Sequence, residues 1–133
     1  ARLQNRLRLA PRMHNAAIIL VFHGSRNPQS QAEAAAFVEA LRSSLPGRHV
    51  SHGFLRECAP GIRDSIVEAV RSGAPEIRLV PIFALTGNHI AVDIPEILRE
   101  AESAHPGRRF SLDPVLVRAP GFLDYLKNSI LEA

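Results

Sequence analysis

The chain has 133 residues, of which 46% are hydrophobic and 22% charged, so one domain with a real core is expected and a largely disordered protein is excluded. No apolar run approaches the roughly 20 residues of a membrane helix, and the lone cysteine, Cys58, excludes a disulfide-stapled scaffold or a cysteine-rich zinc module. The formal net charge is only +3 and aromatic residues make up 5%, which argues against a nucleic-acid-binding surface.

Residues 1–15 differ in character from the rest of the chain. This stretch holds four arginines, and no apolar segment of the kind found in a secretion signal follows them. We expect an appended basic tail, residues 1–15, ahead of a single domain that covers residues 16–133. The missing signal segment and the lack of paired cysteines also predict a cytoplasmic protein.

From residue 16 onward, strand-like and helix-like segments alternate four times. Short runs rich in Ile, Leu and Val predict strands buried on both faces, and apolar residues at helical spacing predict helices. In chain order the expected elements are strand Ala16–Phe22, helix 29–45, strand 49–55, helix 60–73, strand 77–83, helix 93–104, strand 110–115 and helix 120–131. Pro81 indicates that the third strand leaves the ladder before its end, and Asp93 with Pro95 predicts the start of the third helix.

Regular alternation of strands and helices with short connections predicts right-handed crossovers onto a parallel sheet. Four strands are too few for a barrel, so the expected fold is α/β, an open parallel four-stranded sheet with helices on both faces. In the flavodoxin-like strand order 2-1-3-4, the topological switch lies between the first and third strands, and ligands bind there beyond the carboxyl ends.

Two of the expected connections carry a histidine close to a glycine. His23 and Gly24 follow the first strand, and Gly87 and His89 follow the third. Because these strands are neighbours about 4.8 Å apart, two imidazoles at the same edge can share one divalent ion and leave coordination positions open. Imidazole suits first-row metals such as Fe, Co, Ni and Zn. The remaining histidines, His14, His49 and His105, are interpreted as surface or structural residues. The role of His52, in the middle of the second strand, is left open.

Two other chemistries of such a fold have little support. Phosphoryl transfer through His23 requires an arginine directly before the histidine, and Phe22 occupies that position. A flavin site requires an acidic or aromatic stacking loop, and no such loop stands out.

Several motifs, taken together and in order, resemble the class II tetrapyrrole chelatases, and within them the short, single-domain sirohydrochlorin chelatases of the CbiX type. The motifs are residues 19–26 (ILVFHGSR), Phe54-Leu55 followed by Pro60, residues 80–89 (VPIFALTGNH) and Asp93-Ile94-Pro95. The resemblance extends over roughly residues 16–131. His-Gly-Ser alone is a weak signal, but its combination with the two downstream motifs is specific.

The resemblance implies that the chain inserts a divalent metal, Fe²⁺ or Co²⁺ and conceivably Ni²⁺, into sirohydrochlorin in siroheme or cobalamin biosynthesis, without ATP and without an organic cofactor. It assigns His23 and His89 as metal ligands and catalytic residues. Longer relatives carry two such halves in one chain, so a homodimer is expected. A non-catalytic carrier of metal or tetrapyrrole that uses the same pair is the alternative.

The chain also departs from the family pattern. Many relatives have Glu directly after Phe-Leu, where this chain has Arg56, so Glu57 is the candidate proton acceptor from a shifted position. Arginines suit the carboxylates of the substrate, with Arg26 expected first and Arg56 second. Ser25 and Gly87 complete the candidate substrate-binding set, although helix capping is the favoured interpretation for Ser25 and for Thr86.

Overall fold

The computed structural model describes residues 16–132, apart from the side chain of His89. The predicted tail, residues 1–15, lies outside the described residues. Within them, no helix is long and apolar enough to cross a membrane.

The described strands form one parallel sheet. In chain order they are β1 (Ala16–Phe22), β2 (Val50–Phe54), β3 (Glu76–Pro81) and β4 (Arg109–Leu112). The sheet order is β2-β1-β3-β4, which confirms the predicted order, and β3 ends at Pro81, as the sequence indicated. β1 pairs with β2 and with β3, so the carboxyl ends of these three strands meet at one edge.

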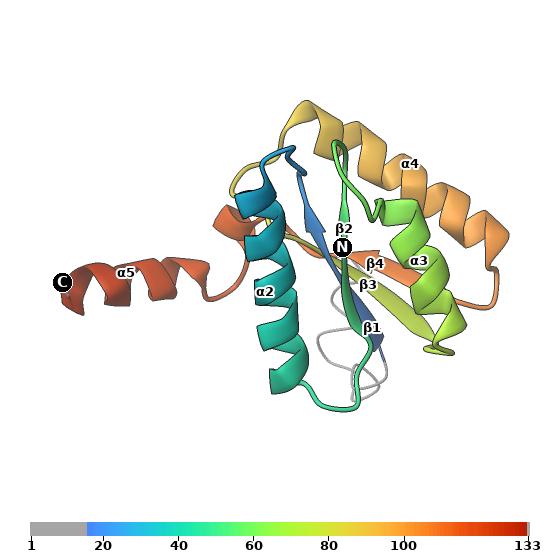
Figure 1. Cartoon of the computed structure of the whole chain (residues 1–133), viewed down its shortest axis with the longest axis horizontal. Helices are drawn as coiled ribbons and strands as arrows, with labels where there is room; N and C mark the ends of the chain where they lie inside the picture. Colours follow the sequence, from blue (N-terminus) through green and yellow to red (C-terminus); the bar gives the residue numbers. More distant parts are fainter. Residues whose placement is uncertain (1–15, 133) are drawn as a thin grey trace.

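Helices cover both faces of the sheet (Figure 1). On one face, α2 (Pro28–Ser44) buries Val38 against Ile18 and Leu20 of β1. On the other face, α3 (Ile62–Arg71) and α4 (Asn88–Ala104) pack their apolar side chains against the alternate residues of β1 and β3. Side chains alternate between the faces along a strand, so β1 is buried on both and forms the centre of the core.

The start of α4 differs from the prediction. The helix begins at Asn88, so Asp93 is not its N-cap and Pro95 lies inside it. Asp followed by Pro imitates a helix start, but Ile90 and Ile94 lie one turn apart and face the same core, and their packing favours a continuous helix across Pro95. Proline has no N–H, so this helix tolerates one missing backbone hydrogen bond there.

The closing helix is present but does not cover the sheet. A short 3₁₀ turn, η2 (Leu116–Arg118), which the sequence analysis did not anticipate, precedes α5 (Phe122–Glu132). Figure 1 shows α5 projecting away from the sheet and its covering helices, and none of its residues is buried.

Candidate functional site

His23 directly follows β1 at the carboxyl edge of the sheet, in the middle of the three strand ends. Its backbone carbonyl accepts a hydrogen bond from the N–H of Arg56 at 3.2 Å, and the carbonyl of Phe22 accepts one from Leu55 at 3.0 Å. The loop after β2 therefore continues the pairing past the end of the strand and runs alongside His23.

Gly24 fits this close approach because it has no side chain. A Cβ built at this position would lie 1.9 Å from the carbonyl oxygen of Arg56, and the φ angle of Gly24 is +104°. Both observations require glycine here. The glycine beside the predicted histidine thus fixes the loop after β1 against the loop after β2.

The first turn of α2 is capped differently from the prediction. Asn27 is the N-cap, and its Oδ1 accepts a hydrogen bond from the N–H of Gln29 at 2.9 Å. Ser25 lies two residues earlier, where its Oγ accepts from the N–H of Asn27 at 3.0 Å. Ser25 therefore shapes the approach to the helix rather than capping it. The N-cap of α4 is Gly87, not Thr86, and it makes no side-chain capping bond.

The imidazole of His23 stands edge-on to the ring of Phe83, with 5.9 Å between ring centroids and 83° between planes. It lines a hollow of about 280 Å³ whose other walls come from the segment after β3. Gly87, Asn88 and Ile90 are among those walls, so chain neighbours on both sides of His89 face the same space as His23. The two segments are brought together, while the meeting of the two rings stays a prediction because the side chain of His89 is outside the described structure.

His89 itself is the second residue of α4, in the first turn of a helix rather than in the loop that the sequence suggested. Residues from Ala84 to Asn88 are exposed at this end of the sheet. Helix N-termini carry a partial positive charge and unpaired N–H groups, which suit carboxylates more than cations. Gly87 is therefore placed to offer backbone rather than side-chain contacts.

A second hollow, of about 460 Å³, lies on the other side of His23, toward α2. It is lined by Gly24 and Ser25 and by the aromatic rings of Phe22, Phe37 and Phe54. His23 thus belongs to both hollows. The aromatic residues around His23 were not predicted from the sequence. Phe83 could have been, because it lies two residues beyond the end of β3 and so at the same edge.

The predicted carboxylate-binding arginine and the predicted proton acceptor contact each other. Nε of Arg26 lies 2.6 Å from Oε2 of Glu57, and the two side chains are 86% and 33% exposed. Glu57 has a φ of 76°, the left-handed region that glycine adopts more easily. Arg56 is exposed beside them, with its backbone against His23.

The other described histidines have structural surroundings. His52, in β2, stands edge-on to Phe22 and to Phe54, and burial, with a smaller contribution from Arg42, lowers the pKa of its imidazole. His105 ends α4 near the ring of Phe110. Among the described side chains, no group of three or more His, Cys, Asp or Glu could hold a metal ion.

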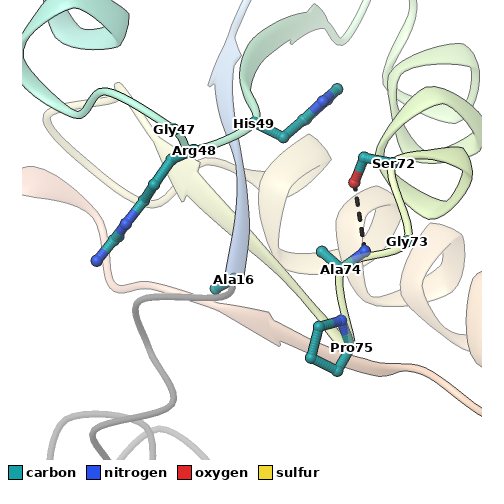
Figure 2. Close-up of a pocket in the computed structure, with 8 residues that line it drawn as sticks. All are labelled: Ala16, Gly47, Arg48, His49, Ser72, Gly73, Ala74 and Pro75. Atoms are coloured by element: carbon teal, nitrogen blue, oxygen red, sulfur yellow. Dashed lines mark hydrogen bonds between the residues drawn. The ribbon is translucent and has the colours of Figure 1, made fainter.

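A further hollow, of about 490 Å³, lies at the opposite end of the strands and is lined by Arg48, His49 and Ser72 (Figure 2). Arg48 and His49 point in opposite directions, and the hydroxyl of Ser72 lies 2.6 Å from the carbonyl of Ala69, to which it donates. These groups do not converge, and parallel sheets bind ligands at their carboxyl ends. The edge that carries His23 is therefore the candidate site.

The fold agrees with the comparisons to known proteins. The chain belongs to the CbiX family, whose family model matches residues 17–133. It is 39% identical to the sirohydrochlorin ferrochelatase of Bacillus subtilis over 71% of this chain and 36% of that protein. It is 34% identical to the sirohydrochlorin cobaltochelatase of Methanopyrus kandleri over 62% of this chain and 57% of that protein.

Solved structures of similar proteins have the same fold. The sirohydrochlorin chelatase SirB from Bacillus subtilis subspecies spizizenii, in complex with cobalt, matches 76% of this chain and 43% of its own, with a TM-score of 0.68 and 36% identity. A CbiX protein from Marinobacter aquaeolei VT8 matches 88% of this chain and 95% of its own, with a TM-score of 0.72, and at 20% identity it supports the fold alone. The chain thus spans about a third to somewhat over half of the length of the two chelatases named above.

Proposed function

We propose that this chain inserts a divalent metal, Fe²⁺ or Co²⁺, into sirohydrochlorin in the cytoplasm, without ATP. The observation that carries the proposal is the hollow at the carboxyl edge, in which His23 faces the residues that flank His89. The names of the curated relatives support the reaction, since they include both a ferrochelatase and a cobaltochelatase of sirohydrochlorin. The metal ion is a substrate in this proposal, and both a ferrochelatase and a cobaltochelatase are similar to this chain.

Metal insertion poses two chemical requirements that this edge can meet. The macrocycle must lose its two pyrrole N–H protons, and a neutral imidazole, with an ordinary pKa of about 6.5, is a suitable base near neutral pH. The metal must also be held by few, exchangeable ligands, because a closed four-ligand site would retain it. We assign both tasks to His23 and His89, with Glu57 as a further proton acceptor.

The rest of the candidate set serves the periphery of the substrate. Arg26 and Arg56 are exposed on the two loops beside His23 and suit the carboxylates of a planar macrocycle. Ser25 and Gly87 line the two hollows that share His23, one on each side. The aromatic ring of Phe83, against which His23 packs, offers an apolar surface for the macrocycle.

The reaction is tested by following sirohydrochlorin absorbance under anaerobic conditions with Co²⁺ or Fe²⁺, with and without the protein. We expect many turnovers per chain, at a rate above that of the free ions. His23→Ala and His89→Ala should each lower the rate at least about tenfold, toward the 10²-fold or larger effect typical of a lost general base. His105→Ala, at the far end of α4, is the matched control and should retain the parent rate.

Two outcomes would contradict the proposal. If both site variants match the parent, the site is wrongly assigned. If product stops at one equivalent per chain, the protein is a carrier of metal or tetrapyrrole rather than a chelatase.

We also propose that the functional unit is a homodimer that α5 helps to form. Leu123, Leu126 and Ile130 are 76%, 41% and 70% exposed and share one face of this 11-residue helix at spacings of three and four. Isolated helices shorter than about 12–15 residues are marginal in water, so a projecting helix of this kind needs a packing partner. A second copy of the chain provides this packing partner. The resemblance to longer relatives, which carry two such domains in one chain, also favours a dimer.

Light scattering on the purified chain tests the dimer. We expect the mass of two chains for the parent and of one chain for Ile130→Glu, because a charge on the apolar face prevents packing. Asn128→Glu, on the polar face of α5, should stay dimeric. A monomeric parent, or a dimer in all three proteins, would contradict the role of α5.

A further inference from the structure

Arg26 and Glu57 come from different loops and hold each other at the rim of the site. Arg26 follows β1 by four residues and Glu57 follows β2 by three, and the 2.6 Å contact between Nε and Oε2 joins the two loops. An arginine that already holds a carboxylate is not available to a second one through the same atom. The pair therefore bears on how the substrate reaches Arg26.

The backbone of the loop that carries Glu57 is held by its packing against the loop after β1. The loop after β2 is bonded to β1 through Leu55 and Arg56, and Gly24 lies against the carbonyl of Arg56. These contacts keep the two loops adjacent. Glu57 also adopts a φ of 76°, a backbone conformation that glycine takes up more easily than a residue with a side chain.

The Arg26–Glu57 pair is much more exposed than a second ion pair in the described part of the chain. Arg78 and Asp113 are bonded through two nitrogens and two oxygens, at 2.9 and 2.7 Å, and their side chains are only 27% and 21% exposed. The side chain of Arg26 is 86% exposed. Water screens such an exposed pair and leaves it weak, so another carboxylate can compete for the arginine.

We propose that Glu57 occupies, in the free protein, the place on Arg26 that a carboxylate of the tetrapyrrole takes on binding. Binding then exchanges one carboxylate for another on the same guanidinium, with no bond made or broken, and releases Glu57 at the edge of the site. Glu57 thus lowers the affinity for the ligand, because it must first be displaced. It also favours ligands that present a carboxylate at Arg26. This proposal rests on the proposed function, because it takes the substrate to be a polycarboxylate macrocycle.

The test is a titration of the metal-free protein with sirohydrochlorin, read by the change in its absorbance, so that turnover is not needed. Glu57→Gln should bind about threefold to tenfold more tightly than the parent, since the competitor is gone. Arg26→Gln should bind more weakly. In the double variant Arg26→Gln/Glu57→Gln, the gain from the second change should disappear, because no arginine is left to be freed.

Glu100→Gln is the matched control. It removes the same charge from another exposed arginine pair, in which Glu100 of α4 lies 2.9 Å from Arg63 of α3 and neither Arg26 nor Glu57 takes part, and it should leave the affinity unchanged. If Glu57 only supports the loop, Glu57→Gln should bind more weakly than the parent. If the gain in affinity comes only from the lost negative charge, the same gain should persist in the Arg26→Gln background. Either result overturns the exchange while the proposed function stands, whereas a parent that does not bind sirohydrochlorin overturns both.

Discussion

The two segments that carry His23 and His89 end neighbouring strands, yet they are held in different ways. The segment after β1 is fixed from its flank, by two backbone hydrogen bonds from the loop after β2 and by the contact of Gly24 with the Arg56 carbonyl. The segment after β3 is bonded to η2 as far as Ala84, and from there to Asn88 its residues are exposed. Its helix then starts at Asn88, and the N-cap residue Gly87 provides no side-chain capping bond.

This difference suggests a division of roles in the proposed reaction. A ligand with a position set by three neighbouring strands can define where the metal is held. A ligand in the first turn of an exposed, uncapped helix depends on fewer contacts, and first and last turns are where helices fray. One segment held by many contacts and one held by fewer would suit a site that must release its metal into a macrocycle.

The largest expected effect comes from substitution at the fixed segment. Gly24→Ala places a Cβ against the Arg56 carbonyl and forces a side chain into a φ of +104°, so we expect a loss of roughly 2–4 kcal/mol in the free energy of unfolding, with a loss of metal insertion. Gly87→Ala is the matched control: no atom lies within 4 Å of its Cβ and its φ is negative, so the change should be small. Urea denaturation measures both. Equal losses at the two glycines would remove the contrast between the segments.

A smaller effect is expected at the ion pair that joins β3 to the residue after β4. Asp113 binds Arg78 through both carboxylate oxygens, and the pair, half-shielded from water, raises the pKa of the Arg78 guanidinium. Asp113→Asn should lower the free energy of unfolding by about 1–3 kcal/mol, because it leaves a partly buried charge without its counterion. Glu100→Gln, in the exposed pair with Arg63, should unfold at the parent's urea midpoint. No loss in Asp113→Asn would show that this pair does not stabilise the sheet next to the segment after β3.

The smallest effect is a dependence on pH at the fixed segment. The imidazole of His52 packs edge-on to Phe22, next to His23, and burial first and Arg42 second lower its pKa below about 6.5. Between that lowered pKa and 6.5 the unfolded chain binds more protons than the folded one. The contribution of His52 to the free energy of unfolding is therefore complete above pH 6.5 and is lost as the pH falls through the lowered pKa. Melting temperatures from pH 8 to 5 should fall less steeply for His52→Phe, which keeps the ring. Parallel slopes would mean that His52 does not couple this segment to pH.

Much of this fold can be read from local sequence patterns. The run from Ala16 to Phe22 has the composition of a central strand, and alternation with helices implies the parallel order that the structure has. The start of α4 could not be read in the same way, because the Asp93–Pro95 signal is local whereas the packing of Ile90 against the core is a tertiary contact. The isolation of α5 escaped prediction for a similar reason: its amphipathic pattern reports an apolar face but not which surface covers it.

For the candidate site, the sequence locates the residues but not their contacts. The switch-point rule places His23 and the segment of His89 at one edge, which the shared hollow agrees with. The pairing of Arg26 with Glu57 depends on how two loops after different strands pack, and no spacing in the sequence encodes it. The ring of Phe83 is different, because its position two residues after β3 already places it at the edge that carries His23.

The arginine-rich composition has a practical consequence at α5. Lys127, adjacent to the exposed Leu126, is the only lysine of the chain. Amine-reactive dyes and crosslinkers therefore modify a single side chain, and it lies on the projecting helix. The labelling rate of Lys127 as a function of protein concentration would report directly, without any mutation, when that helix becomes covered.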